Sequence, residues 1–121
     1  MSFVYVFFGG GLGSVVRYLI GILFQKSSLS LPVATLASNV LACLLFSFSL
    51  HLIESKHVSP SVFKLLILTG FCGGLSTFST FGFETFLLFK QGSMGWALLN
   101  IVISITLCLS SFIFIKKIDG F

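Results

Sequence analysis

The residues with the most evident chemistry lie between positions 70 and 82, where two adjacent glycines precede four hydroxyl-bearing residues. The segment reads Gly-Phe-Cys-Gly-Gly-Leu-Ser-Thr-Phe-Ser-Thr-Phe-Gly. Within a membrane, this composition favours a broken helix, in which freed carbonyl and N–H groups are able to bind ions. Phe78 and Phe81 are spaced i and i+3, so we expect their rings to point in similar directions. Such a pair is ordinary core in most helices, but it lies here beside the expected break.

A second polar group lies in the apolar run around positions 32–53. Thr35 and Asn39 are four residues apart and therefore share one helical face. The Asn39 amide is able to donate two hydrogen bonds, and an unpartnered amide in hydrocarbon is costly. Asn39 is therefore expected to face protein or water, either as a bond between helices or as a group that contacts an ion.

Two charged residues lie inside apolar segments. Arg17 is well within the first one, where a central charge costs about 2.5–3.5 kcal/mol on insertion scales. It is either a structural arginine that snorkels or bonds helix-end carbonyls, or a cation beside an anion path. Glu84 is either a proton or ion ligand, or the partner of a basic residue near the interface.

Two weaker patterns accompany these residues. Asn100, Ser104 and Cys108 follow one another at four-residue intervals, which predicts a mildly polar stripe on the last helix. Glycines at positions 9, 10, 11 and 13 resemble a dinucleotide loop only superficially, since no strand precedes them. Close helix packing through a small-xxx-small pair, Gly9 and Gly13, is the better interpretation.

Composition identifies the elements that must position these residues. Of 121 residues, 56% are hydrophobic and 8% are charged, which excludes an ordinary soluble domain. Hydrophobic stretches at about 3–24, 32–53, 63–89 and 95–115 are each long enough to span a membrane, which takes roughly 20 residues. None shows the alternation of a β-barrel strand. We therefore predict an all-α membrane protein with one transmembrane domain over 1–121 and four spans, the third of them broken.

The charges and cysteines narrow the range of binding partners expected for the protein. The net charge of +4 comes mainly from lysines at span ends, which indicates contact with membrane lipid rather than nucleic acid. The three cysteines have no metal-type spacing and are interpreted as packing residues. No basic segment precedes the first span, so we expect that span to be retained. The lysine bias is small, and it leaves insertion in both orientations open; the side of the N-terminus holds Lys56, Lys64, Lys116 and Lys117, and the other side holds Lys26 and Lys90.

The run from Gly70 to Phe81, together with Gly-Gly-Gly-Leu-Gly-Ser-Val-Val-Arg-Tyr at positions 9–18, closely resembles the Fluc (CrcB) family of small bacterial fluoride channels. The resemblance covers the whole chain. Its length, its four spans, Asn39 in the second span and Glu84 after the third-span break all fall where that family has them. The third-span motif is highly specific.

The resemblance implies an antiparallel, dual-topology homodimer in the bacterial inner membrane. Such a dimer exports fluoride passively through two pores, provides fluoride resistance and holds one structural sodium ion at its centre. Phe78 and Phe81 resemble the ring pair of these channels, Asn39 the pore amide, and Arg17 the first-span arginine. The remaining implied residues are Gly73 and Ser76 as backbone carbonyl ligands of sodium, Ser79, Thr80 and Thr35 as pore hydroxyls, and Asn100 and Ser104 in the fourth-span polar track.

Several positions depart from the family pattern. Ser76 stands where threonine is more usual, but carbonyls rather than side chains would bind sodium, so this change is expected to be harmless. Asn100 stands near a position where tyrosine is common, which changes the expected pore entrance. The other departures are Ala34 and Ala42 in place of glycine, and Gly82 in place of serine.

Other functional classes fit less well. A small proton-coupled multidrug-type exporter also has four helices, but it needs a titratable carboxylate at its substrate site. The first span offers Arg17 instead, and Glu84 lies outside the hydroxyl-rich break. A non-conducting scaffold has no need of such a break. An enzyme is not expected, because His51 and His57 lie near a span end without a nucleophile or metal cluster in register.

Overall fold

The computed structural model describes residues 1–26 and 31–118, and these residues form helices joined by short turns. In chain order the elements are α1 (Ser2–Leu23), α2 (Val33–Glu54), α3 (Pro60–Phe63), a π-helical segment η1 (Lys64–Cys72), α4 (Gly73–Leu75), α5 (Phe78–Lys90) and α6 (Met94–Ile118). Within the described ranges, four helical stretches are long and apolar enough to cross a membrane, namely Ser2–Leu23, Val33–Glu54, Pro60–Lys90 and Met94–Ile118. The predicted all-α fold with four spans is confirmed.

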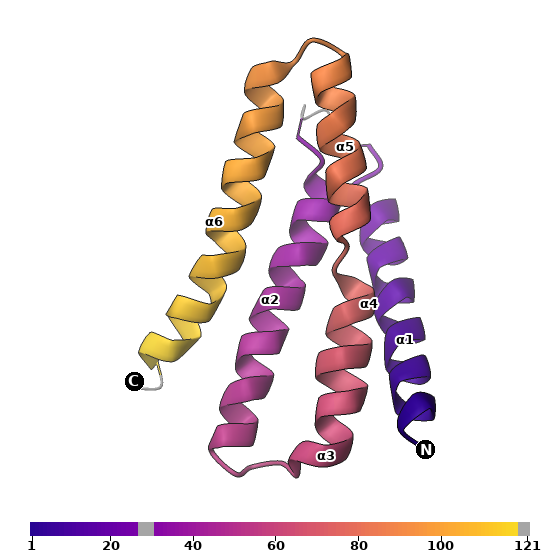
Figure 1. The fold of residues 1–121 in the computed structure, drawn as a ribbon, viewed down its shortest axis with the longest axis vertical. Coiled ribbons are helices and arrows are strands. Elements are labelled where there is room, and N and C mark those ends of the chain that lie inside the picture. The colour runs from indigo at the N-terminus through magenta and orange to yellow at the C-terminus, as the bar shows by residue number, and fades with distance from the viewer. Residues whose placement is uncertain (27–30, 119–121) are drawn as a thin grey trace.

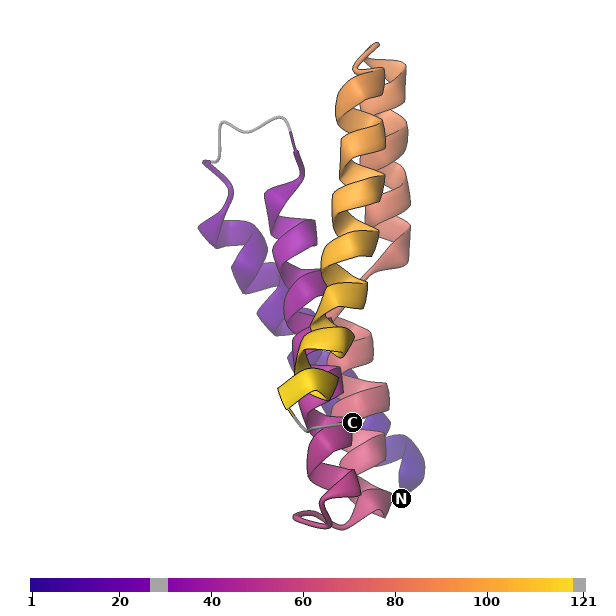
Figure 2. The ribbon, with the colours of Figure 1, turned by 90° about the vertical axis from the view of Figure 1, so that its left-hand side faces the viewer.

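The four spans run up and down between two ends of the molecule. The N-terminus and the end of α6 lie at the same end as the α2–α3 connection, and the α5–α6 turn lies at the opposite end (Figure 1). The helix α1 packs against η1 and α4, whereas α6 packs along α2 and α5. Figure 2 shows α5 and α6 running side by side towards their turn. The third span therefore has different neighbours before and after its break.

The contact between α1 and the third span depends on glycine. A Cβ added at Gly9 would meet the backbone of Leu66 and Gly70, and one added at Gly13 would meet the carbonyl of Phe71. On the facing side, a Cβ at Gly74 would meet the backbone of Gly10. The prediction that the first-span glycines serve close helix packing is confirmed.

The third span breaks at Ser76 and Thr77. Both residues have extended backbone, with φ −82° and ψ 155° at Ser76 and φ −151° and ψ 116° at Thr77. The predicted break is confirmed, but the two adjacent glycines do not form it, since Gly73 and Gly74 are helical. The helix restarts because Thr77 serves as N-cap, its Oγ1 accepting a bond from the Thr80 N–H at 3.2 Å. The preceding π-helix was not predicted.

The surface and interior have the polarity expected in lipid. Large side chains such as Phe3 and Phe7 point outward, with 90% and 75% of their surface exposed. Buried serines satisfy their hydroxyls within their own helices: Ser47 donates to the Cys43 carbonyl at 2.6 Å and Ser111 to the Leu107 carbonyl at 2.9 Å. The chain is therefore a multi-pass membrane protein with an apolar exterior and polar contacts inside.

Candidate functional site

A cavity of about 260 Å³ lies beside the break, between α2, α5 and α6. Three segments that are far apart in the sequence supply its walls. Its lining consists of Asn39, Cys43, Ser76, Thr77, Phe78, Phe81, Ser104, Ile105 and Cys108. Four of the predicted pore residues, Asn39, Phe78, Phe81 and Ser104, are thus brought together in one place.

Asn39 holds the break in position. Its Oδ1 accepts a hydrogen bond from the Thr77 N–H at 2.8 Å, and its Nδ2 donates to the Thr77 carbonyl at 3.4 Å. The amide therefore replaces the helical partners that Thr77 loses on leaving the helix. A primary amide carries two N–H donors, so the second N–H of Asn39 remains for another acceptor in the cavity.

The same hydrogen bonds free two carbonyls. In a continuous α-helix, the N–H groups of Thr77 and Thr80 would bond the carbonyls of Gly73 and Ser76. Here Thr77 donates to Asn39 instead, and Thr80 donates to the hydroxyl of Thr77. Gly73 is exposed, and a Cβ placed there would meet nothing within 4 Å. The carbonyls of Gly73 and Ser76, the two predicted sodium ligands, have thus both lost their helical donors.

Phe78 and Phe81 lie next to each other at the start of α5. Their ring centroids are 5.8 Å apart and their planes are inclined by 41°. Phe78 exposes 84% of its surface, and Phe81 is half-buried. The interpretation of the pair as ordinary core does not fit Phe78 within this chain, because a core ring would be covered.

The other hydroxyl residues near the break serve its N-cap. Thr77 Oγ1 donates to Thr80 Oγ1 at 3.2 Å and lies 3.2 Å from Ser79 Oγ. Neither Ser79 nor Thr80 is part of the cavity wall described above, so within one chain these two predicted pore residues cluster around the start of α5.

Glu84 has a hydroxyl as its hydrogen-bond partner. Thr35 Oγ1 donates to Glu84 Oε1 at 2.7 Å and so ties α2 to α5. The other carboxyl oxygen, Oε2, is buried and makes no hydrogen bond to the described residues. Thr35 therefore lies beside Glu84 and does not line the cavity that Asn39 lines. The sequence had placed Thr35 and Asn39 on the same helical face.

Asn100 is buried between α5 and α6. It exposes only 1% of its surface, and its Nδ2 donates to Thr85 Oγ1 at 2.9 Å, while its Oδ1 accepts from Ser104 at 3.4 Å. Asn100 therefore links α6 to α5 and is not on the cavity wall, whereas Ser104 is. Thr85, which sequence reasoning did not single out, completes this link; its position four residues after Phe81 was the available signal.

Arg17 supports the broken helix from α1. Its Nε donates to the carbonyl of Gly74 at 3.1 Å. This carbonyl precedes the break, and in a continuous helix it would accept from residue 78. The interpretation of Arg17 as a structural arginine that bonds helix-end carbonyls matches this contact.

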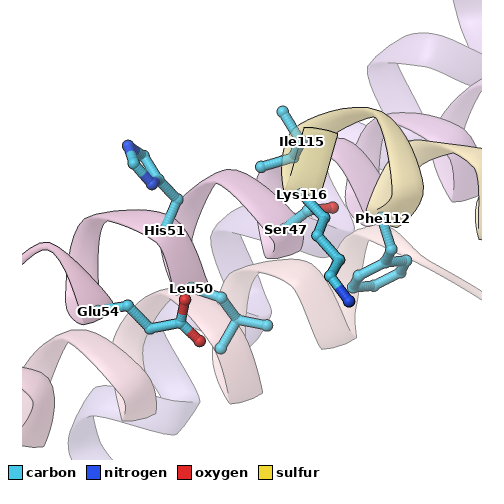
Figure 3. A pocket seen from close by; sticks show the side chains of 7 residues that line it. All are labelled: Ser47, Leu50, His51, Glu54, Phe112, Ile115 and Lys116. Atoms are coloured by element: carbon cyan, nitrogen blue, oxygen red, sulfur yellow. The ribbon is translucent and has the colours of Figure 1, made fainter. Parts of the chain in front are cut away.

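A second cavity, of about 350 Å³, lies near the ends of α2 and α6. Figure 3 shows the Glu54 carboxylate and the extended Lys116 side chain around Leu50 and Phe112, with the His51 ring turned away. Charged groups at this level are typical of the membrane–water boundary. None of the predicted pore residues lines it.

Comparison with known proteins gives consistent matches. The sequence model of a family described as "CrcB-like protein, Camphor Resistance (CrcB)" matches residues 4–115. A Yersinia pseudotuberculosis protein named fluoride-specific ion channel FluC 1 is 42% identical over 117 residues, which cover 93% of this chain and 91% of the relative. A protein of Escherichia coli O17:K52:H18 named fluoride-specific ion channel FluC is 41% identical over 100 residues, 83% of this chain and 79% of the relative. A Salmonella arizonae protein of the same name is 42% identical with the same coverage.

Proposed function

The chain belongs to the CrcB-like family, and on this premise we propose that it is a fluoride-selective ion channel that exports fluoride passively. Its relatives are named as ion channels, not enzymes, and they are bacterial, which corresponds to the inner membrane for a multi-pass protein. The observation that carries the proposal is the cavity at the helix break, where an amide, three hydroxyl residues and two aromatic rings converge.

The chemistry of the cavity suits a small, strongly hydrated anion. Such an ion enters a pore only if protein groups replace its water. The second N–H of Asn39 is a hydrogen-bond donor of this kind, and the Ser104 hydroxyl becomes one if it exchanges its long, 3.4 Å bond to Asn100 Oδ1 for the ion. The rims of Phe78 and Phe81 add positive potential, because an aromatic quadrupole is positive at its edge and negative on its face.

The carbonyls of Gly73 and Ser76 support the second part of the proposal, a structural sodium ion. Hard cations prefer oxygen ligands, and unwound helix carbonyls provide them in transporters. Both carbonyls have lost their helical donors to side-chain contacts. When bound there, the ion would supply fixed positive charge close to the anion path.

An antiparallel, dual-topology homodimer is the assembly we propose. Phe78 and Gly73 are exposed in the single chain although they lie in the middle of the third span. A second copy facing the break would cover both residues and add carbonyls around the same sodium ion. The small lysine bias between the two sides fits insertion in both orientations.

One observation favours a second candidate, a small proton-coupled multidrug-type exporter. The Oε2 atom of Glu84 is buried and makes no hydrogen bond among the described residues, as expected of a carboxyl that carries a proton. Glu84 does not line the cavity beside the break, however, so the exporter would have to bind its substrate elsewhere.

Fluoride efflux from liposomes separates the two functions. With equal pH on both sides and a potassium ionophore to balance charge, a fluoride electrode should record rapid release from liposomes that contain the protein. Protein-free liposomes provide the background rate. A requirement for the ionophore would support electrogenic passage, whereas efflux only in the presence of a proton gradient would favour the exporter.

A further inference from the structure

Cys43 and Cys108 are not needed for the proposed conduction, yet both lie on the wall of the cavity. They come from α2 and α6, and each lies four residues beyond a polar residue of the same cavity, Asn39 and Ser104 respectively. The side chains therefore occupy the same helical faces one turn further along. Both side chains thus border the same cavity from two facing helices.

The pair has the properties of a ligand set rather than of inert core. Both cysteines are free thiols and are partly exposed, whereas Cys72 is buried. A thiol is a weak hydrogen-bond donor, so this pair contributes little to the dehydration of a hard anion such as fluoride. Sulfur ligands instead select soft metal ions.

We propose that Cys43 and Cys108 form a two-thiolate site for soft divalent cations of the mercuric type, and that an ion bound there obstructs the cavity. On binding, each thiol releases one proton to water and forms one metal–sulfur bond. The two thiolate charges cancel the charge of the dication. A neutral complex is the form that a low-dielectric membrane interior tolerates.

The surroundings of the pair indicate which cations it prefers. Zinc in protein sites generally takes four ligands in tetrahedral geometry. Among residues 1–26 and 31–118, no group of three or more His, Cys, Asp or Glu side chains is placed to hold a metal. Cys72 borders a neighbouring cavity that Cys43 also lines, but its side chain is buried. Two thiolates satisfy the linear coordination of Hg²⁺ and leave Zn²⁺ short of ligands.

The position of the site explains the expected obstruction. The cavity is about 260 Å³, and its wall also carries Asn39, Phe78 and Phe81. An ion between Cys43 and Cys108 fills part of this space and ties α2 to α6. Fluoride that passes Asn39 and the rings would therefore meet a narrowed cavity.

Metal binding to the purified full-length protein tests the site without reference to transport. The Cys72→Ser chain provides the background, because it leaves the pair as the sole thiols of the sequence. Titration with Hg²⁺ should give one ion bound and two protons released per chain.

Adding Cys43→Ser or Cys108→Ser removes one metal–sulfur bond, which should weaken binding by more than about 100-fold, since even outer-shell partners are worth about 10–100-fold. Alanine at the same positions provides second variants, and size-exclusion chromatography confirms assembly. Equal affinity for Hg²⁺ in the Cys72→Ser chain and in both chains that also carry Cys43→Ser or Cys108→Ser would overturn the site.

Fluoride efflux tests the obstruction. Each variant is compared with its own rate before metal is added, and protein-free liposomes report any leak caused by Hg²⁺. Hg²⁺ should remove most of the fluoride flux of the Cys72→Ser chain at concentrations at which Zn²⁺ leaves the flux unchanged. Excess dithiol should restore the flux. Binding without inhibition would overturn the obstruction. Absence of flux before any metal is added would contradict the proposed function, while the binding titration would still decide the site.

Discussion

Substitutions at Phe78 and Phe81 distinguish a packing role of the two rings from contact with an ion. We expect Phe78→Ile or Phe81→Ile to reduce fluoride efflux by more than about tenfold, because isoleucine keeps apolar bulk but has no electropositive rim. Phe78 is almost fully exposed in the single chain, so its replacement should cost little stability within that chain. The measurement is efflux from liposomes, normalised to correctly assembled protein.

Methionine at either position is the matched control, since its polarizable thioether is softer than an aliphatic chain. Phe78→Met and Phe81→Met should retain part of the flux that the isoleucine variants lose. Unchanged rates in both isoleucine variants would mean that the rings only pack and that the ion passes elsewhere.

Asn39 combines a structural and a conducting role, and two substitutions separate them. Asn39→Asp keeps an oxygen for the Thr77 N–H but loses the amide donors and adds negative charge, so fluoride efflux should fall by more than about tenfold while the protein still assembles. Asn39→Leu removes both bonds and leaves backbone groups of Thr77 unpaired. We expect it to lower stability by about 1–3 kcal/mol.

Thermal unfolding in detergent, monitored by circular dichroism, measures this difference. An Asn39→Asp protein that conducts like the unmodified one would show that the amide donors serve no ion. Sequence reasoning found Asn39 because a lone amide in an apolar run needs a partner. It did not identify Thr77 as that partner, because the contact joins residues 38 positions apart.

At the scale of elements, glycines set the distance between α1 and the third span. Gly13→Ala places a methyl group against the carbonyl of Phe71, and we expect overpacking to cost about 1–3 kcal/mol. Gly11→Ala is the control from the same helix, since a Cβ there meets nothing within 4 Å. It should be neutral or stabilising, because alanine favours helix over glycine by about 1 kcal/mol.

Thermal melting of the two purified variants provides the comparison. Equal losses in Gly11→Ala and Gly13→Ala would contradict the close contact between α1 and η1. The Gly9 and Gly13 spacing was readable in the sequence, since small residues four apart share a face. Their partners on the third span were not, because several glycines there offered equally suitable faces.

The break itself shows what local pattern does and does not determine. The change from glycine to hydroxyl residues located it to within a few positions. Its exact place depends on the N-cap bond from the Thr80 N–H to Thr77 Oγ1 and on the bond from the Thr77 N–H to Asn39 Oδ1. The π-helix before it left no sequence signal, because Lys64–Cys72 is apolar over most of its length and offers no clear periodicity.

At the scale of the whole molecule, dual topology predicts two populations of chains. The N-terminus and the end of α6 lie at the same end of the helical bundle (Figure 1). If copies insert in both orientations, a tag on the C-terminus should be accessible from outside in about half of the chains. Impermeant labelling of intact and permeabilised membrane vesicles measures this fraction. Labelling of either all chains or none in intact vesicles would contradict the antiparallel dimer.

The number of membrane-spanning helices followed from composition and hydropathy, because the membrane demands long apolar helices. The assignment of Asn100 to the pore stays a prediction, and within this chain its bond to Thr85 places it at the interface of α5 and α6. A polar stripe on one helix does not reveal whether its members face a cavity or another helix.

The central claim is that fluoride crosses the membrane through this protein as a free ion, and the reversal potential of its current tests that claim most directly. Purified protein in a planar bilayer, with a fluoride gradient, equal chloride and equal pH on both sides, should carry a current that reverses at the equilibrium potential of fluoride. Changing the pH of one side should leave that potential where it was. A reversal potential that follows the chloride or proton gradient, or no current at all, would contradict the account.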